Sequence, residues 1–177
     1  IKVATTEENV TDNYLSSDDV INVYISGIDS RGGINEVSRS DVNIIMSINK
    51  KTHNILMINT PRDYYVPLSI SNGVRDKLTH AGVYGIECSR NTLEMLYGIQ
   101  IDYYVKVNFS GFEKIIDSLG GVDVTLDYSA TLSQAGNLTV HNGVNHFNGE
   151  QALAFARERY AYSDGDRQRG RNQMMIM

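Results

Sequence analysis

Short β-branched segments alternate along this chain with amphipathic segments that end at glycine. Residues 20–26 are rich in valine and isoleucine and stop at Gly27, which predicts a buried strand. Residues 109–119 place large apolar side chains at helical spacing ahead of Gly120, which predicts a helix. Strands that alternate with helices are typical of the α/β class, and 177 residues are enough for one domain with a core.

The predicted sheet is mixed, because two of its strands are joined by a short turn. Residues 41–48 and 55–60 both have strand composition, the polar residues 49–54 lie between them, and Pro61 ends the second strand. Strands joined in this way run antiparallel, whereas strands connected through a helix run parallel. The other predicted elements are a helix that ends at Gly98, strands over 101–108 and 121–126, a hairpin around 137–143, a helix opened by Asn148 and Gln151 at capping-box spacing, and a last helix from Asp166.

Residues 1–19 are polar and carry few periodic apolar positions, so we expect a loose lead-in to the fold. No run of about eighteen apolar residues occurs, so the sequence predicts no membrane-spanning segment. The single cysteine, Cys88, leaves no partner for an internal disulfide, and we expect it to be a small buried side chain.

Arginines gather near the C-terminal end, in the stretch "ARERYAYSDGDRQRGRNQ" over residues 156–173, although the chain as a whole is acidic. The formal net charge of -5 argues against a general nucleic-acid binder, whose footprint is a basic face. The P-loop, zinc-protease and nucleophile-elbow motifs are absent from the sequence. The arginine cluster therefore indicates either a disordered basic tail or a folded site for a multiply charged anion.

Charged residues also stand at predicted strand ends, where α/β folds place their sites. Asp29 follows the first strand, Arg39 and Asp41 open the next, and Arg62 and Asp63 follow the third. Two carboxylates that flank one loop suit a hard cation such as Mg²⁺, which takes oxygen ligands and substrate phosphates, and arginine binds phosphate through its planar fork. Less specific alternatives stay open, since a strand-end aspartate is often a turn residue and an Arg–Asp neighbour pair is often a surface ion pair.

Helix geometry limits which arginines can share a ligand. If the last helix begins near Asp166, Arg169 and Gln173 lie four residues apart on one face, and the other arginines of that segment lie on a different face. Arg157 and Arg159 point to opposite sides of a continuous helix. Both can face one ligand only if that helix ends between them and the chain becomes extended.

Read in order, these clusters and the segments between them resemble the LytR-CpsA-Psr family. The resemblance covers about residues 20–173, in the order found in the family. The segments that carry it are "GIDSR", "SRSDVNIIMSIN", "TPRDYYV", "DKLTHAGVYG", "IDYYVKVNFSGFEKIIDSLGGVDV" and "NGEQALAFARER…DRQRGRNQ".

The resemblance implies an α/β fold, an α-β-α sandwich with a mixed central sheet. It implies a catalytic domain over residues 20–177 whose C-terminal helix is truncated, and a lead-in over 1–19 that follows a missing N-terminal membrane anchor. It also implies a Mg²⁺-dependent phosphotransferase on the extracytoplasmic face of the membrane of a Gram-positive-type bacterium. Such an enzyme moves an anionic glycopolymer, such as teichoic acid or capsule, from an undecaprenyl-pyrophosphate carrier to peptidoglycan, and nucleic acid is not an expected partner.

The resemblance also assigns roles to individual residues. It implies that Asp29 and Asp41 hold Mg²⁺. Lys77 matches a family segment in which Thr79 replaces the usual asparagine, and Asp63 is a candidate general base. The residues expected to act in catalysis are Arg62, Asp63, Arg157 and Arg159. The residues expected to bind the pyrophosphate are Arg31, Arg39, Arg62, Lys77, Arg157, Arg159, Arg167, Arg169 and Gln173.

Two other functions are compatible with the same residues. A polyprenyl-pyrophosphate hydrolase would use these groups to activate water instead of a sugar hydroxyl. A non-catalytic, regulatory module that binds the wall or a lipid would keep the arginines and an apolar pocket but would need no metal ion. Product analysis with and without a glycan acceptor separates the two enzymes, and turnover separates both from the binding module.

Overall fold

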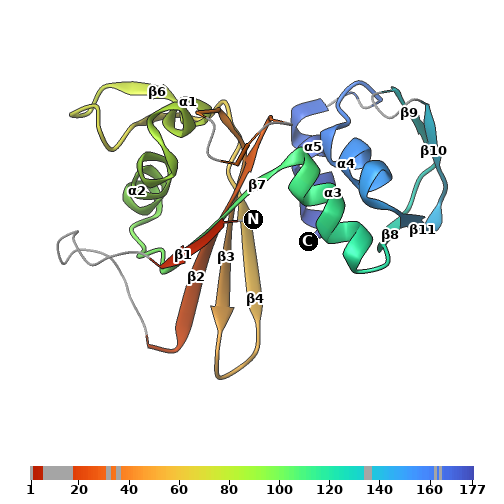
Figure 1. Ribbon diagram of the computed structural model, residues 1–177, viewed down its shortest axis with the longest axis horizontal. Coiled ribbons are helices and arrows are strands. Elements are labelled where there is room, and N and C mark those ends of the chain that lie inside the picture. Colours follow the sequence, from red (N-terminus) through yellow and green to blue (C-terminus); the bar gives the residue numbers. More distant parts are fainter. Residues whose placement is uncertain are drawn as a thin grey trace. The chain divides into compact units, whose positions relative to one another are not determined.

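The structure is a computed structural model of the chain, and it describes residues 2–5, 18–30, 33–34, 37–133, 137–161, 163 and 165–177. The chain forms two compact units, Ile1–Asn108 and Phe109–Met177, which are shown in Figure 1. The boundary between the units lies within residues 20–177, which were predicted to form a catalytic domain.

The first unit is built on a mixed sheet that has five strands among the described residues. β2 is parallel to β7, and the other neighbouring pairs are antiparallel. The predicted class, α/β with a mixed central sheet, is therefore confirmed, as is the turn between the strands on either side of residues 50–54. In sheet order the strands are β1 (Lys2–Thr5), β7 (Tyr103–Asn108), β2 (Val20–Ile28), β3 (Ser40–Asn49) and β4 (Ile55–Asn59).

The prediction of a loose lead-in over residues 1–19 is wrong for Lys2–Thr5, which form β1. β1 pairs antiparallel with β7, with Val3 opposite Val105. An unpaired edge strand presents a row of free backbone groups, and β1 satisfies those of β7. A four-residue strand is too short to show periodicity, which is why the sequence pattern did not predict it. The rest of the predicted lead-in up to residue 17 lies outside the described residues.

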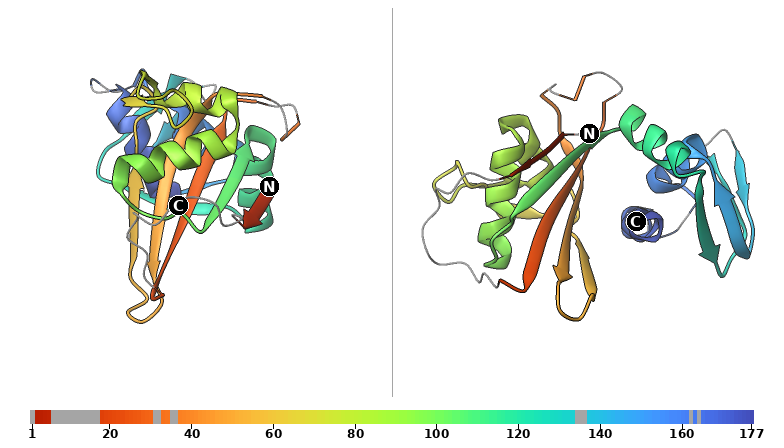
Figure 2. Two further views of the ribbon diagram at one scale, coloured as in Figure 1. Left: turned by 90° about the vertical axis from the view of Figure 1, so that its left-hand side faces the viewer. Right: turned by 60° about the horizontal axis from the view of Figure 1, so that its bottom comes forward.

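One face of this sheet is covered by α2, which lies across the strands in the left view of Figure 2. Leu93 of α2 packs in one buried cluster with Tyr24 and Ile45 of the strands. Gly98 ends α2 in the left-handed conformation (φ 65°), as predicted, and Cys88 is buried, as expected. The elements between β4 and β7 are β5 (Tyr65–Pro67), β6 (Arg75–Lys77), α1 (Leu78–Ala81), the 3₁₀ turn η1 (Gly82–Tyr84) and α2 (Ile86–Tyr97).

Among its described residues, the second unit packs three helices with short antiparallel strand pairs around its own core. Phe147 and Phe155 lie 5.3 Å apart between ring centroids at its centre, with Leu132 and Ile116 in the same cluster. Its elements are α3 (Phe109–Ser118), β8 (Val122–Leu126), β9 (Ala130–Leu132), β10 (Leu138–Val140), β11 (Gly143–Phe147), α4 (Gly149–Arg157) and α5 (Gly165–Ile176).

The hairpin predicted around 137–143 is wrong, because the strands on either side of this turn pair with other strands. β10 pairs with β9, and β11 pairs with β8, so the turn between β10 and β11 does not join two paired strands.

The capping box that opens α4 is confirmed, because Asn148 accepts from the Gln151 N–H at 2.9 Å and Gln151 accepts from the Asn148 N–H at 3.1 Å. Gly149 lies against the backbone of Glu113 in α3, where a Cβ would overlap the Glu113 carbonyl.

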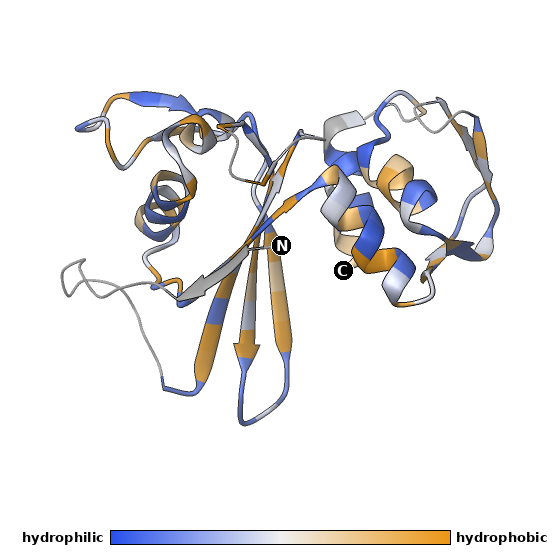
Figure 3. Cartoon of the chain, in the orientation of Figure 1, coloured by the Kyte–Doolittle hydropathy of each residue, from blue (hydrophilic) through white to orange (hydrophobic). Residues whose placement is uncertain are grey.

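Apolar residues run along much of β2, β3 and β4, as Figure 3 shows. In the part of the chain that the structure describes, no helix has both the length and the apolar character needed to cross a membrane.

Candidate functional site

Asp41 occupies a β-bulge at the end of the β2–β3 pair. Gly27 pairs with Val42 and Ile28 pairs with Ser40, so Asp41 is the extra residue on its strand. A bulge disrupts the ladder locally and redirects a side chain, and bulges often lie next to active sites. In this case the bulge directs the Ser40 hydroxyl into the core and leaves the Asp41 carboxylate free to contact other elements.

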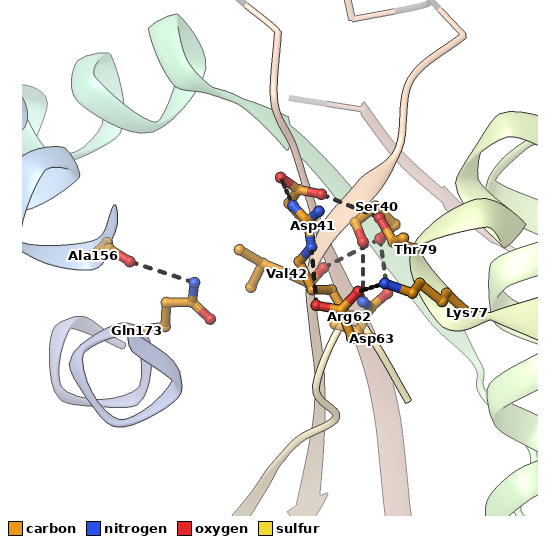
Figure 4. A network of polar contacts seen from close by, with 10 residues as sticks. Ser40, Asp41, Val42, Arg62, Asp63, Lys77, Thr79, Ala156 and Gln173 are labelled. Carbon is orange, nitrogen blue, oxygen red and sulfur yellow. Dashed lines mark hydrogen bonds and ion pairs between the residues drawn. The ribbon is translucent and has the colours of Figure 1, made fainter. Parts of the chain in front are cut away.

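The Asp41 carboxylate accepts a hydrogen bond on each oxygen (Figure 4). The Arg62 Nη1 donates to Oδ2 at 2.7 Å, and the Thr79 Oγ1 donates to Oδ1 at 3.1 Å. The Arg62 and Asp41 side chains are 22% and 18% exposed, so the ion pair is partly shielded from water. Such a pair is screened less than one on the surface.

Backbone hydrogen bonds hold Arg62 in this position. Thr60 donates its N–H to the Asn43 carbonyl at 2.8 Å, where β4 ends, and the Arg62 carbonyl accepts from the Thr79 N–H at 2.8 Å. The buried Nε of Arg62 has no hydrogen-bond partner among the described residues and lies 3.8 Å from Asp63 Oδ2. A buried donor without an acceptor is costly, so Arg62 is prepared to donate to an anion.

Lys77 brings a second cation to this cluster. β5 and β6 pair so that Tyr65 lies opposite Lys77, and the Lys77 Nζ donates to Asp63 Oδ1 at 2.8 Å (Figure 4). The Lys77 and Asp63 side chains are 51% and 43% exposed. An exposed ion pair adds little stability, so Lys77 remains available to a charged ligand at little cost.

The other charged residues predicted near the strand ends are exposed. Asp29 directly follows β2 and Arg39 directly precedes β3. Because Ile28 pairs with Ser40, Asp29 and Asp41 each lie one residue from the same ladder pair. Arg31 lies outside the described residues.

A buried polar network, which was not predicted from the sequence, lies behind the bulge. Tyr24, Ser26, Ser40 and Asn43 are at most 1% exposed. The Tyr24 hydroxyl donates to Asn43 Oδ1 at 2.7 Å, and Ser40 Oγ lies 3.0 Å from the Tyr24 hydroxyl and 2.9 Å from Ser26 Oγ. Burial raises the pKa of Tyr24 above its ordinary value, so its hydroxyl stays protonated. The available signal was a set of polar residues at inward-facing positions of otherwise apolar strands.

In the second unit, α4 ends at Arg157, so the helix does not continue to Arg159. Arg157 is its last residue, and Glu158 is extended (φ −63°, ψ 133°), so the predicted condition for both arginines to face one ligand is met. Glu158 is fully buried, and its Oε1 accepts from the N–H groups of Arg159, Tyr160 and Ala161 at 2.8, 2.7 and 3.2 Å. This carboxylate, which the sequence analysis missed, holds the turn that follows the helix. The Arg157 guanidinium lies 4.4 Å from the centre of the Phe109 ring.

α5 packs against α4 through polar side chains. Asn172 is fully buried and donates to the Phe155 carbonyl at 3.0 Å, and Gln173 donates to the Ala156 carbonyl at 3.4 Å (Figure 4). Arg169, which lies one turn before Gln173, is half-buried. The remaining arginines of this helix, Arg167 and Arg171, are exposed.

The predicted site residues therefore form two groups, one in each unit. The first unit brings Asp41, Arg62, Asp63 and Lys77 together, with Thr79 as an added member. The second unit places its predicted residues at the end of α4 and on α5. In the described part of the chain, no three His, Cys, Asp or Glu side chains form a candidate metal cluster.

Comparison with known proteins gives consistent matches over at least nine tenths of the chain. The LytR_cpsA_psr family model matches residues 1–177. The chain is 33% identical over 168 residues to the polyisoprenyl-teichoic acid–peptidoglycan teichoic acid transferase TagU of Bacillus cereus, covering 92% of this chain and 52% of that protein. It is 35% identical over 168 residues to the corresponding transferase TagT of Bacillus subtilis, covering 90% of this chain and 51% of that protein. The chain thus spans about half the length of these curated relatives.

Solved structures agree with the fold. The crystal structure of B. subtilis TagV superposes with a TM-score of 0.78 at 29% identity, covering 91% of this chain and 63% of that chain. The structure of the LytR-CPS2A-psr family protein YwtF (TagT) with bound octaprenyl pyrophosphate lipid superposes with a TM-score of 0.73 at 33% identity, covering 89% and 61%.

Proposed function

Because this chain belongs to the LytR_cpsA_psr family, we propose that it is a phosphotransferase that moves an anionic glycopolymer from a polyprenyl-pyrophosphate carrier to peptidoglycan. The names of the curated relatives support the reaction class, and the lipid-bound relative supports the carrier. The observation in this chain that carries the proposal is Arg62. Its Nη1 is paired with Asp41, while its buried Nε has no acceptor among the described residues.

A doubly charged phosphate ester suits that unused donor. Arginine binds phosphate with two parallel N–H groups, and its charge persists at any relevant pH. Lys77, paired with Asp63 near Arg62, adds a cation that acts on phosphate as a point charge. We propose that Arg62 and Lys77 bind the pyrophosphate in the first unit, together with Arg31 and Arg39. For the second unit, taken by itself, we propose that phosphate binds at Arg157, Arg159, Arg167, Arg169 and Gln173.

The donor set fits a hard cation. Each carboxylate oxygen has more than one lone pair, so Asp41 keeps acceptor capacity beyond its bonds to Arg62 and Thr79. Mg²⁺ is typically held by one or two carboxylates plus substrate phosphates, so a cluster of three protein ligands is not required. We propose that Asp41 and Asp29 would hold Mg²⁺. When bound, it would neutralise charge that develops on the phosphoryl oxygens.

The proposed transfer makes one phosphorus–oxygen bond and breaks another. A peptidoglycan hydroxyl attacks the glycan-side phosphorus, and polyprenyl phosphate leaves with the bridging oxygen. The arginines hold the two phosphates in line, which is most of what a phosphoryl-transfer site must do. The hydroxyl proton needs an acceptor, for which Asp63 is the candidate. The alternative to this catalytic role is a structural one, in which Asp63 only forms its ion pair with Lys77.

This reaction places the protein at a membrane surface beside the cell wall. We propose the extracytoplasmic face of a Gram-positive-type cell membrane, since the carrier is a membrane lipid and the acceptor is peptidoglycan. A membrane anchor N-terminal to this chain would keep the catalytic domain close to its lipid substrate.

An activity assay with Asp41→Ala tests the proposal. Wild-type protein should transfer polymer from a polyprenyl-pyrophosphate donor to peptidoglycan with Mg²⁺ present and should lose activity on chelation. Asp41→Ala should lose transfer while its circular dichroism and unfolding midpoint stay close to wild type. Full transfer by a folded Asp41→Ala protein would remove the proposed role of this carboxylate.

A further inference from the structure

The Thr79 hydroxyl contacts Asp41, the proposed metal-binding carboxylate. Thr79 is 1% exposed and donates from Oγ1 to Asp41 Oδ1 at 3.1 Å. Threonine's two Cβ substituents restrict χ1, so a buried threonine presents its hydroxyl in a defined direction. Figure 4 shows this contact on the opposite oxygen from the one that Arg62 contacts.

The backbone around Thr79 is tied to the same elements that carry Asp41 and Arg62. The Thr79 N–H donates to the Arg62 carbonyl at 2.8 Å, and the Leu78 N–H donates to the Tyr64 carbonyl at 2.9 Å. Gly82, one turn later, touches the strand that leads into the bulge, since a Cβ there would lie 2.5 Å from Ser40 N. The helix that carries Thr79 is therefore fixed against both sides of the cluster.

The two donors to Asp41 are not equivalent. Arg62 is charged, partly exposed and proposed to contact the phosphate, so ligand binding competes for its N–H groups. Thr79 is neutral and buried, so it orients the carboxylate without neutralising the charge that attracts a cation. Partners of this kind, which hydrogen-bond to metal ligands, typically change metal affinity about 10–100-fold when removed.

We infer that Thr79 is a positioning residue that sets the orientation of the Asp41 carboxylate for a divalent cation. This inference rests on the proposed function, in which Asp41 is a metal ligand.

Divalent-cation binding to the 177-residue chain tests this role without an activity assay. Mn²⁺ is the probe, because it prefers the same oxygen ligands as Mg²⁺ and its free concentration can be read by electron paramagnetic resonance. Thr79→Val keeps the shape and removes the hydroxyl, so we expect Mn²⁺ affinity to fall about tenfold or more. Thr79→Ser restores the hydroxyl and should restore wild-type affinity. If Thr79→Val does not fold, Thr79→Ala takes its place.

Asp41→Ala separates failure of the inference from failure of the proposed function. If Asp41→Ala loses Mn²⁺ binding but Thr79→Val binds like wild type, Thr79 does not position the carboxylate. Equal losses in Thr79→Val and Thr79→Ser would also overturn the inference, because the hydroxyl would then be irrelevant. If Asp41→Ala itself binds Mn²⁺ like wild type, the proposed metal site is wrong and the inference with it.

Discussion

Arg62 donates from Nη1 to Asp41 Oδ2 at 2.7 Å, while its buried Nε has no hydrogen-bond partner among the described residues. The Arg62 Nη1 is thus fixed to one carboxylate, while its Nε lies 3.8 Å from a second carboxylate oxygen, Asp63 Oδ2. Two residues 21 positions apart meet because a bulge redirects Asp41 and because Arg62 follows the strand that pairs with β3.

Arg62→Lys tests the geometry of this guanidinium. Lysine keeps the positive charge but loses the planar fork and its Nε donor. A hydrogen bond to a charged group contributes about 1.5–3 kcal/mol, so affinity for geranylgeranyl pyrophosphate should fall roughly tenfold to hundredfold. Isothermal titration calorimetry measures this. Arg75→Lys, at an exposed position of β6, is the control, and equal losses in both variants would exclude a specific role for Arg62.

Arg169→Ala and Arg171→Ala compare two faces of α5. Arg169 is half-buried on the side of Gln173, whereas Arg171 is exposed and donates to Gln168 of its own helix at 3.0 Å. We expect Arg169→Ala to weaken binding of a polyprenyl-pyrophosphate analogue tenfold or more, for a loss of about 1.5–3 kcal/mol. Arg171→Ala should cost less than about 1 kcal/mol. A larger loss for Arg171→Ala would mean that the other face of α5 meets the ligand.

Glu158→Leu tests the turn that separates Arg157 from Arg159. Leucine fills a similar volume but leaves three backbone N–H groups without their carboxylate acceptor. We expect the free energy of unfolding to fall by about 1–3 kcal/mol in urea titrations. Glu150→Gln, at an exposed position in the first turn of α4, should change it by less than about 1 kcal/mol. An unchanged stability in Glu158→Leu would show that the turn forms without the buried carboxylate.

Glu94→Gln should alter how stability depends on pH. Burial raises the pKa of Glu94 above its ordinary 4.5, and the hydrogen bond from the Ile101 N–H opposes that shift. Its contribution to stability is therefore present below pH 4.5 and is lost as pH rises through the folded-state pKa. Glutamine removes this titration but still accepts from Ile101. Relative to wild type, Glu94→Gln should become more stable in urea titrations as the pH rises from below 4.5 through the raised folded-state pKa of Glu94. A difference in unfolding free energy between Glu94→Gln and wild type that stays constant as the pH rises would contradict the raised pKa of Glu94.

Features determined by neighbouring residues could be predicted from the sequence. The capping box of Asn148 and Gln151, the glycine stop at Gly98 and the strand from Val20 all depend on local spacing, and all are confirmed. β1 depends on pairing with β7, a distant segment that local composition does not indicate, whereas β10 pairs with the preceding strand β9 instead of with β11. Those are the two elements for which the prediction was wrong.

The same distinction applies to the candidate site. Strand ends indicated Asp41, Arg62 and Asp63 individually, but the contact between Asp41 and Arg62 depends on a register shift that the sequence does not show. Glu158 had no signal beyond its charge, because its role depends on backbone N–H groups that converge only once α4 has ended. Thr79 was visible as a departure from the family pattern, but its hydrogen bond to Asp41 required the structure.

The most direct test of the proposed transfer is the stoichiometry of its products. Wild-type protein is incubated with a polyprenyl-pyrophosphate-linked polymer and peptidoglycan, and the lipid and wall products are quantified by mass spectrometry. We predict one polyprenyl phosphate released for each polymer joined to peptidoglycan through a phosphodiester, and no release without the acceptor. Free polymer phosphate formed equally with and without peptidoglycan would contradict the transfer and indicate hydrolysis.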